Sequence, residues 1–214
     1  MEQGSRRKAT AMGAPIDQIL LSGGERLDVR PIRTTDAPSL VAMHARLSAD
    51  SIYRRYFGAR PHLSPTDVRH FTTIDEEWRF ALVGVRESGE LAAVARYEGS
   101  PGSAVAELAL VVDDALQGRG VGRAMLSRLI EVAAVRGLAA LVADVLTRNA
   151  PMLRLLRTAG VPTTPVREPD SVRITLHLDG VRLPGPRRAV ASAQVDEARA
   201  AARQRAGGAG LVRE

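Results

Sequence analysis

The chain has 214 residues and a formal net charge of +6, with 45% hydrophobic and 25% charged residues. These proportions are typical of globular proteins and exclude a chain that is disordered or collagen-like throughout. The length predicts one domain. Because the sequence has no cysteine, disulfides, thiolate zinc sites, iron–sulfur clusters and cysteine nucleophiles are excluded.

The positive charge raises nucleic acid as a partner, but its distribution argues against one. Residues 181–214 carry a net charge of +4, so much of the excess lies at one end of the chain. Aromatic residues are only 3% of the sequence, which is few for a surface that stacks on bases. We therefore expect no nucleic-acid partner.

The N-terminal segment shows no membrane or secretion signal. Its first ten residues are charged and polar, and the apolar stretch at 16–21 is too short for a signal sequence or a membrane span. We expect a soluble cytoplasmic protein with no membrane partner, in which residues 1–26 form a flexible tail.

The first predicted elements after this tail are a strand and three helical segments. The alternating residues 27–33 predict a strand, and Asp36 is a candidate N-cap for the helix that follows. Residues 50–57 predict a second short helix. Ser64 and the proline after it begin a further turn or two. Apolar and aromatic positions recur at helical spacing in the first helix at Leu40, Met43, His44 and Leu47.

The middle of the chain predicts three consecutive strands. Residues 78–86 and 91–98 form a hairpin with Gly89 in its turn, and residues 104–112 form the third strand.

The remaining elements alternate between helix and strand before a last hairpin. A helix over 121–135 is followed by a strand at 139–146 and a helix at 150–158, and a terminal hairpin turns around Asp170. Gly137 and Gly160 end the two helices. The order of elements predicts a mixed α/β sheet, not a doubly wound one. The domain spans 27–180, and 181–214 form an Arg/Ala-rich tail with a solvated helix near 194–205.

The most informative segment is VVDDALQGRGVGRAML, in which a strand runs through a glycine-rich loop into a helix. Gly118, Gly120 and Gly122 leave backbone amides accessible where the helix begins, and these amides and the helix dipole favour an anion such as a phosphate ester. A dinucleotide-binding fingerprint would need glycine at Arg123, and a Walker loop would need Gly-Lys-Ser/Thr. The sequence matches neither motif.

This loop resembles the Q/R-x-x-G-x-G/A signature of the GNAT acetyltransferase superfamily. The resemblance covers about residues 27–178. It includes the order of elements and a second segment, RNAPMLRLLRTAGV, in which Asn149 and Gly160 match the family pattern. It implies a mixed, mostly antiparallel central sheet that is flanked by helices and splayed at an acetyl-CoA site.

The resemblance also implies which residues bind acetyl-CoA. Amides of residues 118–123 would contact the pyrophosphate, and the strand end would pair with the pantetheine arm, with Asn149 close to it. Charge would come from Arg119 and Arg123, and no metal is implied. The implied binding residues are Leu110, Val111, Val112, Gln117, Gly118, Arg119, Gly120, Val121, Gly122, Arg123 and Asn149.

A narrower resemblance concerns bacterial protein lysine acetyltransferases of the Pat type. Residues 48–65, the run WRFALVGVR and the strand AELALVV look like the catalytic domain of these enzymes, which modify acyl-CoA synthetases. Such enzymes are often fused to a nucleotide-binding regulatory domain, for which we expect no room here. A protein lysine, such as one in an acyl-CoA synthetase, is the implied acceptor.

Acyl transfer to an amine needs a base, because a free lysine is protonated below a pKa of about 10.4. Glu107 lies in an otherwise apolar strand, where the resembling enzymes carry a glutamate base. We expect burial to raise its pKa toward a useful range, with a water as a relay. The alternative is a glutamate that faces solvent or pairs with an arginine. A backbone amide near Leu110 or Val111 would meet the oxyanion.

The general acid of many GNAT enzymes is missing from its usual place. These enzymes carry a tyrosine seven residues after the asparagine, where this chain has Leu156. Tyr53, Tyr56 and Tyr97 are the alternatives, unless the thiolate leaves unaided. The four histidines show no metal-ligand spacing and are assigned structural or surface roles.

Together these features predict an acetyl-CoA-dependent N-acetyltransferase whose preferred acceptor is a protein lysine. The alternatives are an acetyltransferase for a small amine and a non-catalytic acyl-CoA-binding module.

Overall fold

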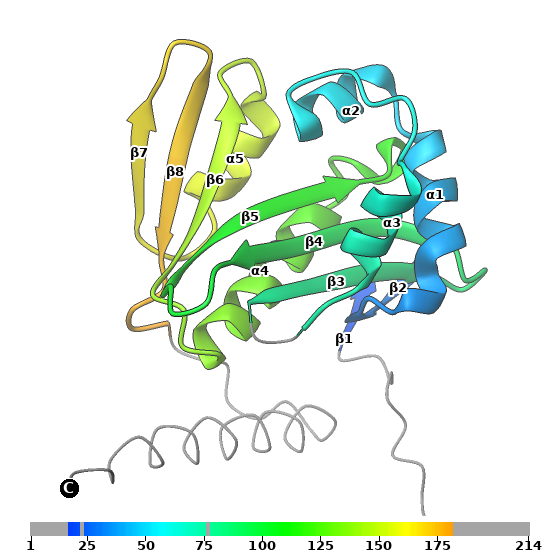
Figure 1. Cartoon of the computed structure of the whole chain (residues 1–214), viewed down its shortest axis with the longest axis horizontal. Coiled ribbons are helices and arrows are strands. Elements are labelled where there is room, and N and C mark those ends of the chain that lie inside the picture. The colour runs from blue at the N-terminus through cyan, green and yellow to red at the C-terminus, as the bar shows by residue number, and fades with distance from the viewer. Residues whose placement is uncertain (1–16, 22–23, 76–77, 182–214) are drawn as a thin grey trace, which may run out of the picture.

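The computed structural model of the chain describes residues 17–21, 24–75 and 78–181 (Figure 1). They form an eight-stranded sheet in the order β1-β2-β3-β4-β5-β6-β8-β7, in which the pairing of β5 with β6 is parallel and all other pairings are antiparallel. The strands are β1 (Asp17–Leu20), β2 (Arg26–Pro31), β3 (Arg79–Arg86), β4 (Leu91–Gly99), β5 (Val105–Val112), β6 (Ala140–Leu146), β7 (Thr163–Arg167) and β8 (Ser171–His177).

Helices cover both faces of this sheet. One face carries α1 (Ala37–Arg46), α2 (Ala49–Tyr56) and α3 (Pro65–Thr72), and the other carries α4 (Val121–Val135) and α5 (Ala150–Arg157). Single 3-10 turns, η1 (Thr34–Asp36) and η2 (Asp114–Leu116), precede α1 and the glycine loop. The predicted mixed, mostly antiparallel α/β fold is confirmed.

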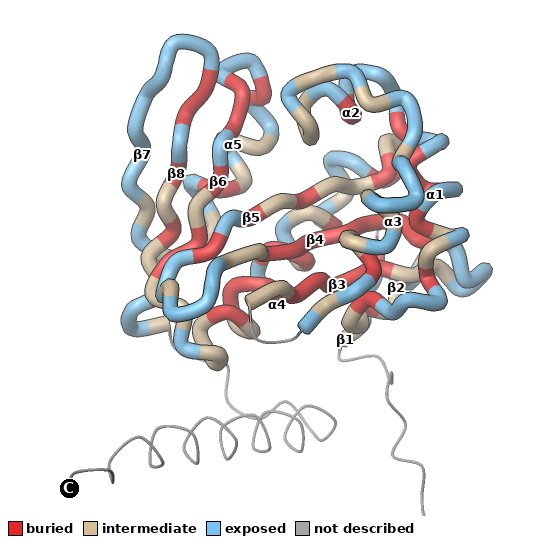
Figure 2. The backbone as a smooth tube through the Cα atoms, viewed as in Figure 1, coloured by how far each residue is buried: buried red, intermediate tan, exposed pale blue. Residues whose placement is uncertain are grey.

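The core is divided between the two faces because neighbouring residues of a strand point to opposite sides. Leu82 and Tyr97 pack with Met125 and Leu129 of α4, whereas Val83 packs in the smaller cluster under α1. Strands β3 and β4 are buried along most of their length, while the edge strand β7 is largely exposed (Figure 2). Burial on both faces explains why the first five residues of β4, 91–95, form a continuous apolar run.

The sheet opens between β5 and β6. The two strands pair only where Val105–Glu107 meets Ala140–Val142, although β5 continues to Val112 and β6 to Leu146. Beyond this point the two ribbons diverge in Figure 1. In the described part of the chain, the residues from Leu108 to Val112 therefore have no strand partner on the β6 side, so the predicted splay is present.

Of two expectations near the N-terminus, one is wrong and the other holds in position alone. Asp17–Leu20 do not belong to a tail but form β1, which pairs with β2 and buries Ile19. Asp36 is the N-cap residue of α1, as predicted, but its side chain makes no capping hydrogen bond to this helix. Instead its carboxylate accepts hydrogen bonds from both terminal nitrogens of Arg30, each at 2.7 Å, and from the backbone of Arg33 at 2.8 Å. A buried carboxylate needs such partners, and the guanidinium satisfies more of its lone pairs than a helix cap would.

The other predicted elements are observed with small shifts of boundary. Ser64 caps α3 through its side chain, which accepts a hydrogen bond from the backbone of Asp67 at 3.1 Å. Gly89, Gly137 and Gly160 adopt positive φ, as turn and helix-end positions require. The last hairpin adds an unpredicted crossover, because β8 lies between β6 and β7. The expected C-terminal tail and the helix near 194–205 lie outside the described residues.

Candidate active site

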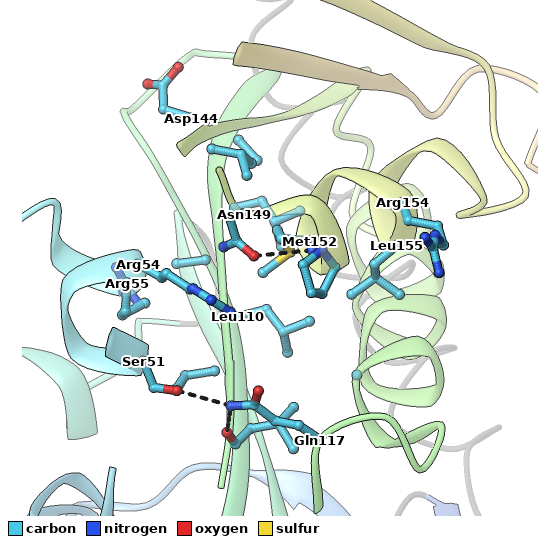
Figure 3. A pocket seen from close by; sticks show the side chains of 18 of the residues that line it. Ser51, Arg54, Arg55, Leu110, Gln117, Asp144, Asn149, Met152, Arg154 and Leu155 are labelled. Atoms are coloured by element: carbon cyan, nitrogen blue, oxygen red, sulfur yellow. Dashed lines mark hydrogen bonds between the residues drawn. The ribbon is translucent and has the colours of Figure 1, made fainter. Parts of the chain in front are cut away.

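A cavity of about 830 Å³ lies at the splay between β5 and β6. In Figure 3, Arg54 and Arg55 of α2 lie on one side of it, Asn149, Met152 and Leu155 lie on the other, and Leu110 of β5 lies between them. The cavity extends from the start of α4 to Glu107. A second cavity, of about 230 Å³, adjoins it there and shares the residues Arg55, Tyr56, Glu107 and Ala109 with it.

The glycine loop has the geometry of a phosphate site. Gly118 has φ +74° and Gly120 has φ +87°, both in the left-handed region that favours glycine. A Cβ atom built at either position would meet no heavy atom within 4 Å, so the space in front of the backbone is open. Because the first amides of α4 lack partners within the helix, the loop and helix together fit a phosphate ester.

Gly122 has a different role from the other two glycines. It lies inside α4, and a Cβ built there would be 3.5 Å from Leu155 of α5 and 3.7 Å from Leu110 and Val112 of β5. The missing side chain therefore lets the start of α4 approach both neighbours at ordinary contact distance.

Gln117 holds the loop through its side chain. Its amide nitrogen donates to Ser51 Oγ at 3.0 Å, to Asp114 Oδ1 at 2.7 Å and to the carbonyl of Val112 at 3.2 Å. Ser51 in turn donates to Asp114. Burial opposes ionisation of Asp114, but the hydrogen bonds from Ser51 and Ser48 outweigh it and lower the pKa of this carboxyl. This network ties α2 to the phosphate loop.

The register of β5 decides which backbone groups face the splay. The amide of Asp113 donates to the carbonyl of Ala92 at 2.8 Å, so Asp113 points toward β4. Since backbone groups alternate along an antiparallel pair, Leu108, Leu110 and Val112 point toward the splay and Val111 points toward β4. Of the two amides expected to meet an oxyanion, Leu110 is therefore the one on the correct edge.

Asn149 begins α5. Its side chain accepts a hydrogen bond from the backbone of Met152 at 3.3 Å, as an N-cap does (Figure 3). Seven residues on, Leu156 is fully buried in the core under the sheet. A residue at that position therefore contributes to packing in this chain.

The structure brings most of the predicted site residues to the cavity wall. Two do not line it: Val121 is fully buried, and the Arg119 side chain pairs with Glu25 at 3.2 Å. Those that do are Glu107, Leu110, Val111, Val112, Gln117, Gly118, Gly120, Gly122, Arg123 and Asn149.

Glu107 lies where the two cavities meet. It is an exposed residue, so the burial expected for the base is not observed. Across the β4–β5 pair it faces Glu98. Within the described part of the chain its carboxylate makes no hydrogen bond or ion pair, so the structure matches the alternative of a glutamate that faces solvent and not that of one paired with an arginine.

The three tyrosines take different places. Tyr97 is buried in the core and accepts a hydrogen bond from Arg136 at 3.3 Å, whereas Tyr53 is 39% exposed. Tyr56 lines both cavities. Burial raises the pKa of Tyr56, against the effect of Arg55 and Arg60, so its hydroxyl stays protonated.

Several histidines are engaged in hydrogen bonds. A ring nitrogen of His44 lies 2.7 Å from the carbonyl of Arg60, and His177 lies 2.9 Å from Thr164. Among the described residues there is no group of three or more His, Cys, Asp or Glu placed to hold a metal ion. No helix in the described ranges is both long and apolar enough to span a membrane.

Of the cavity residues of α2, sequence reasoning singled out only Tyr56, as a candidate acid, and missed Ser51, Arg54 and Arg55. Ser51, Arg54, Arg55 and Tyr56 line the main cavity from this helix. Their signal in the sequence is the polar run DSIYRRY with two adjacent arginines, but such a run is equally typical of a solvent-exposed helix face. The position of α2 beside the splay is what makes these side chains part of the site.

A splayed sheet with an open glycine loop at one end of the cavity and a carboxylate at the other is the arrangement expected of an acyl-CoA-dependent acyltransferase. The model of the acetyltransferase (GNAT) family matches residues 47–161. The chain belongs to the acetyltransferase (GNAT) family, and the expected acetyl-CoA-dependent N-acetyltransferase is confirmed at the level of that family.

The chain is similar to proteins of the Pat type. It is 29% identical over 161 residues to acetyltransferase Pat of Mycolicibacterium smegmatis, a match over 73% of this chain and 47% of that relative. The chain thus spans about half the length of this curated relative. Among solved structures, the GNAT domain of S. lividans PAT is 36% identical, with a TM-score of 0.69 and coverage of 75% of this chain and 96% of that one.

Another solved structure shares the fold at lower identity. YncA of Salmonella typhimurium, described as an acetyltransferase with its cofactor acetyl-CoA, is 24% identical with a TM-score of 0.56, over 74% of this chain and 97% of that one.

Proposed function

We propose that this chain transfers the acetyl group of acetyl-CoA to the side-chain amine of a protein lysine, with Glu107 as the general base. The observation that carries the proposal is that one cavity reaches from the glycine loop to Glu107, whose carboxylate has no ion-pair partner within the described ranges. A thioester held by the loop and the β5 edge would place its carbonyl between them. The similarity to Pat proteins supports a lysine as acceptor.

The chain's own groups supply the steps of the reaction. The amine nitrogen attacks the thioester carbonyl, the carbon–sulfur bond breaks and the sulfur leaves as a thiolate. Glu107 takes up the proton that the amine loses, directly or through a water. The amide of Leu110, on the edge that faces the splay, donates to the oxyanion.

The leaving group places a smaller demand on the protein. A thiol has a pKa of about 8.5, so the thiolate is a tolerable leaving group at neutral pH. Since Leu156 is buried, the protonated Tyr56 is the tyrosine of the cavity wall that can supply a proton. Gly118, Gly120 and Arg123 bind and orient the phosphate end.

Glu107→Gln tests the base. The substitution keeps the shape of the side chain, and we expect turnover at neutral pH to fall by about a hundredfold to ten-thousandfold. The loss should shrink at high pH, where the acceptor amine is already deprotonated. Turnover is measured as thiol release with acyl-CoA synthetases, polyamines and aminoglycosides as acceptors, and mass spectrometry identifies any modified lysine.

Glu168→Gln is the matched control. Glu168 lines the same cavity from the far wall and accepts a hydrogen bond from Ser171 at 2.9 Å, away from the splayed edge of β5. It should keep near wild-type turnover. Near wild-type turnover for Glu107→Gln, with acetyl-CoA affinity intact by calorimetry, would overturn the assignment of the base. Absence of transfer to any acceptor would favour a non-catalytic acyl-CoA-binding module.

A further inference from the structure

The smaller cavity, of about 230 Å³, lies beyond Glu107 on the face of the sheet that carries α1, α2 and α3. Its wall combines arginines and aromatic rings from α2, α3 and the loop between them with the ends of β4 and β5. The volume suits a short side chain or the backbone beside it, since a water molecule occupies about 30 Å³ of liquid. An acceptor whose amine reaches Glu107 must place its neighbouring atoms here.

Three of the five charged residues on this wall already have partners. Arg96 donates to Glu98 at 3.1 Å, and Glu98 is also 3.0 Å from a ring nitrogen of His70. Arg60 donates to Asp67 at 3.3 Å. These charges are held within the protein and are not free for a ligand.

Arg55 and Glu107 are different. Neither makes a hydrogen bond or an ion pair with the described residues, although both line both cavities. The Arg55 guanidinium lies over the ring of Tyr56, 4.9 Å from its centroid, which positions the group but satisfies none of its five N–H donors. Arg55 is half-buried, and burial lowers the pKa of its guanidinium while Tyr56 and Glu107 act in the opposite direction.

Among the residues that the structure describes, the wall of the smaller cavity thus holds one cation and one carboxylate, Arg55 and Glu107, that have no hydrogen-bond or ion-pair partner. In the proposed reaction, the Glu107 carboxylate takes up the proton of the acceptor amine. A partly desolvated guanidinium without an acceptor is costly, and a carboxylate is the group whose geometry it matches in a bidentate pair. The phosphate end of acetyl-CoA does not provide it, because the glycine loop that fits phosphate lies at the other end of the main cavity.

We propose that Arg55 binds a carboxylate of the acceptor, so that the preferred amine carries a carboxylate close by, as a lysine with a neighbouring aspartate or glutamate does. This inference rests on the proposed function and names the chemistry of its acceptor. The amine lies at Glu107 and the carboxylate at Arg55. The same chemistry occurs in a free amino acid, whose own carboxylate would occupy the Arg55 position.

Matched acceptors test this inference and separate the two sources. In each pair of lysine peptides, one peptide has an aspartate next to the lysine and the other has an asparagine there. One pair carries this residue before the lysine and a second pair carries it after the lysine. Nα-acetyl-lysine is compared with its methylamide, which lacks the carboxylate. We expect the carboxylate to raise kcat/KM by about tenfold to a hundredfold, the value of a charge-assisted hydrogen bond, chiefly through the KM of the acceptor.

Arg55 variants then assign the preference to this side chain. In Arg55→Gln the ratio of kcat/KM between the aspartate and asparagine peptides should fall toward one, and Arg55→Lys should retain part of it. Arg55→Glu should reverse the preference toward a peptide with a second lysine beside the acceptor. Calorimetry with acetyl-CoA shows that each variant is folded.

Arg60→Gln is the matched control. Arg60 lies over the same ring of Tyr56, at 4.8 Å, but it is already paired with Asp67. The variant loses the same charge and stacking, yet it should keep the preference for aspartate. If both variants lost the preference for aspartate equally, the preference would come from the overall positive charge of the site, and the role of Arg55 would be overturned.

The remaining outcomes are also decisive. Equal rates for the aspartate and asparagine peptides with the wild type would overturn this inference and leave the lysine acceptor standing. Acetylation of Nα-acetyl-lysine but of no peptide, with a carboxylate preference, would support Arg55 and overturn the protein acceptor. Acetylation of none of these amines would overturn both.

Discussion

The two sides of the splay recognise their ligands in different ways. The proposed cofactor flank comprises the loop at 117–123, the β5 edge at 108–112 and the start of α5, and its open glycine positions and splayed strand edge offer backbone groups to a ligand. The acceptor flank comprises α2, α3 and the ends of β4 and β5 around Glu107, and it presents charged and aromatic side chains. A common cofactor can be bound by a generic backbone motif, whereas acceptor choice requires side chains that differ from one enzyme to another.

The largest expected effect is on the cofactor flank, where Gly120→Glu should abolish acetyl-CoA binding. The new side chain would enter the open space in front of the loop, place a negative charge at the phosphate position and strain a residue at φ +87°. Calorimetry measures the affinity. Gly89→Glu is the control, because Gly89 has φ +85° and equally open surroundings but lies in the β3–β4 turn. It should carry similar strain and keep the affinity.

The cofactor flank is also held by apolar packing, which Leu156→Ala tests. Leu156 is fully buried, so the substitution should cost about 2 to 5 kcal/mol of the free energy of unfolding through the cavity it leaves. Urea denaturation measures this loss. Because a leucine moves no proton, the shape of the pH–rate profile should stay that of the wild type. A lost or shifted limb of that profile would show that the position takes part in the chemistry.

The helices of the acceptor face depend more on charge, which Asp36→Asn tests. The Arg30–Asp36 pair is mostly buried, with side chains 13% and 9% exposed. Removing one partner should cost about 3 kcal/mol of the free energy of unfolding. Burial opposes ionisation of Asp36, but the hydrogen bonds from Arg30 and Arg33 outweigh it and lower its pKa below the usual 3.8.

The sign of the pH dependence follows from this lowered pKa. The carboxylate is more stable in the folded than in the unfolded chain, so its contribution is present above about pH 4 and is lost as the pH falls through the folded value. The wild type should therefore lose stability in this acid range, and Asp36→Asn should lose less. If the free energy of unfolding fell equally with pH in the wild type and in Asp36→Asn, the attribution of this pH dependence to Asp36 would be contradicted.

The smallest expected effect is at Ser51, which joins the two flanks. Ser51→Ala removes the hydroxyl that links Gln117 and Asp114. We expect a loss of about 1 kcal/mol of the free energy of unfolding, the usual value of one hydrogen bond, and a several-fold weaker acetyl-CoA affinity. Thermal unfolding and calorimetry measure the two effects. An unchanged affinity would show that α2 and the loop are independent.

The contrast between the flanks also describes what could be predicted from the sequence. Glycines in the loop and at helix ends act through local backbone conformation, so Gly118, Gly120 and the boundaries of α4 follow from short stretches of sequence. Strand β1 was missed because its four residues gain their stability from pairing with β2 and not from their own pattern. The sequence predicted that Arg119 contacts the phosphate because it lies in the glycine loop. In the structure its side chain pairs with Glu25, which is far from it in the chain.

The sequence by itself determined the mixed α/β order, the phosphate loop and the strand that carries Glu107, because each depends on residues that are neighbours in the chain. Only the tertiary structure decided that Glu107 is exposed and that Leu110 faces the splay. It also decided that Arg55 has no hydrogen-bond or ion-pair partner among the described residues, while Arg60 and Arg96 have theirs. These properties depend on side chains from α2, α3, β4 and β5, which the fold brings together from positions many residues apart.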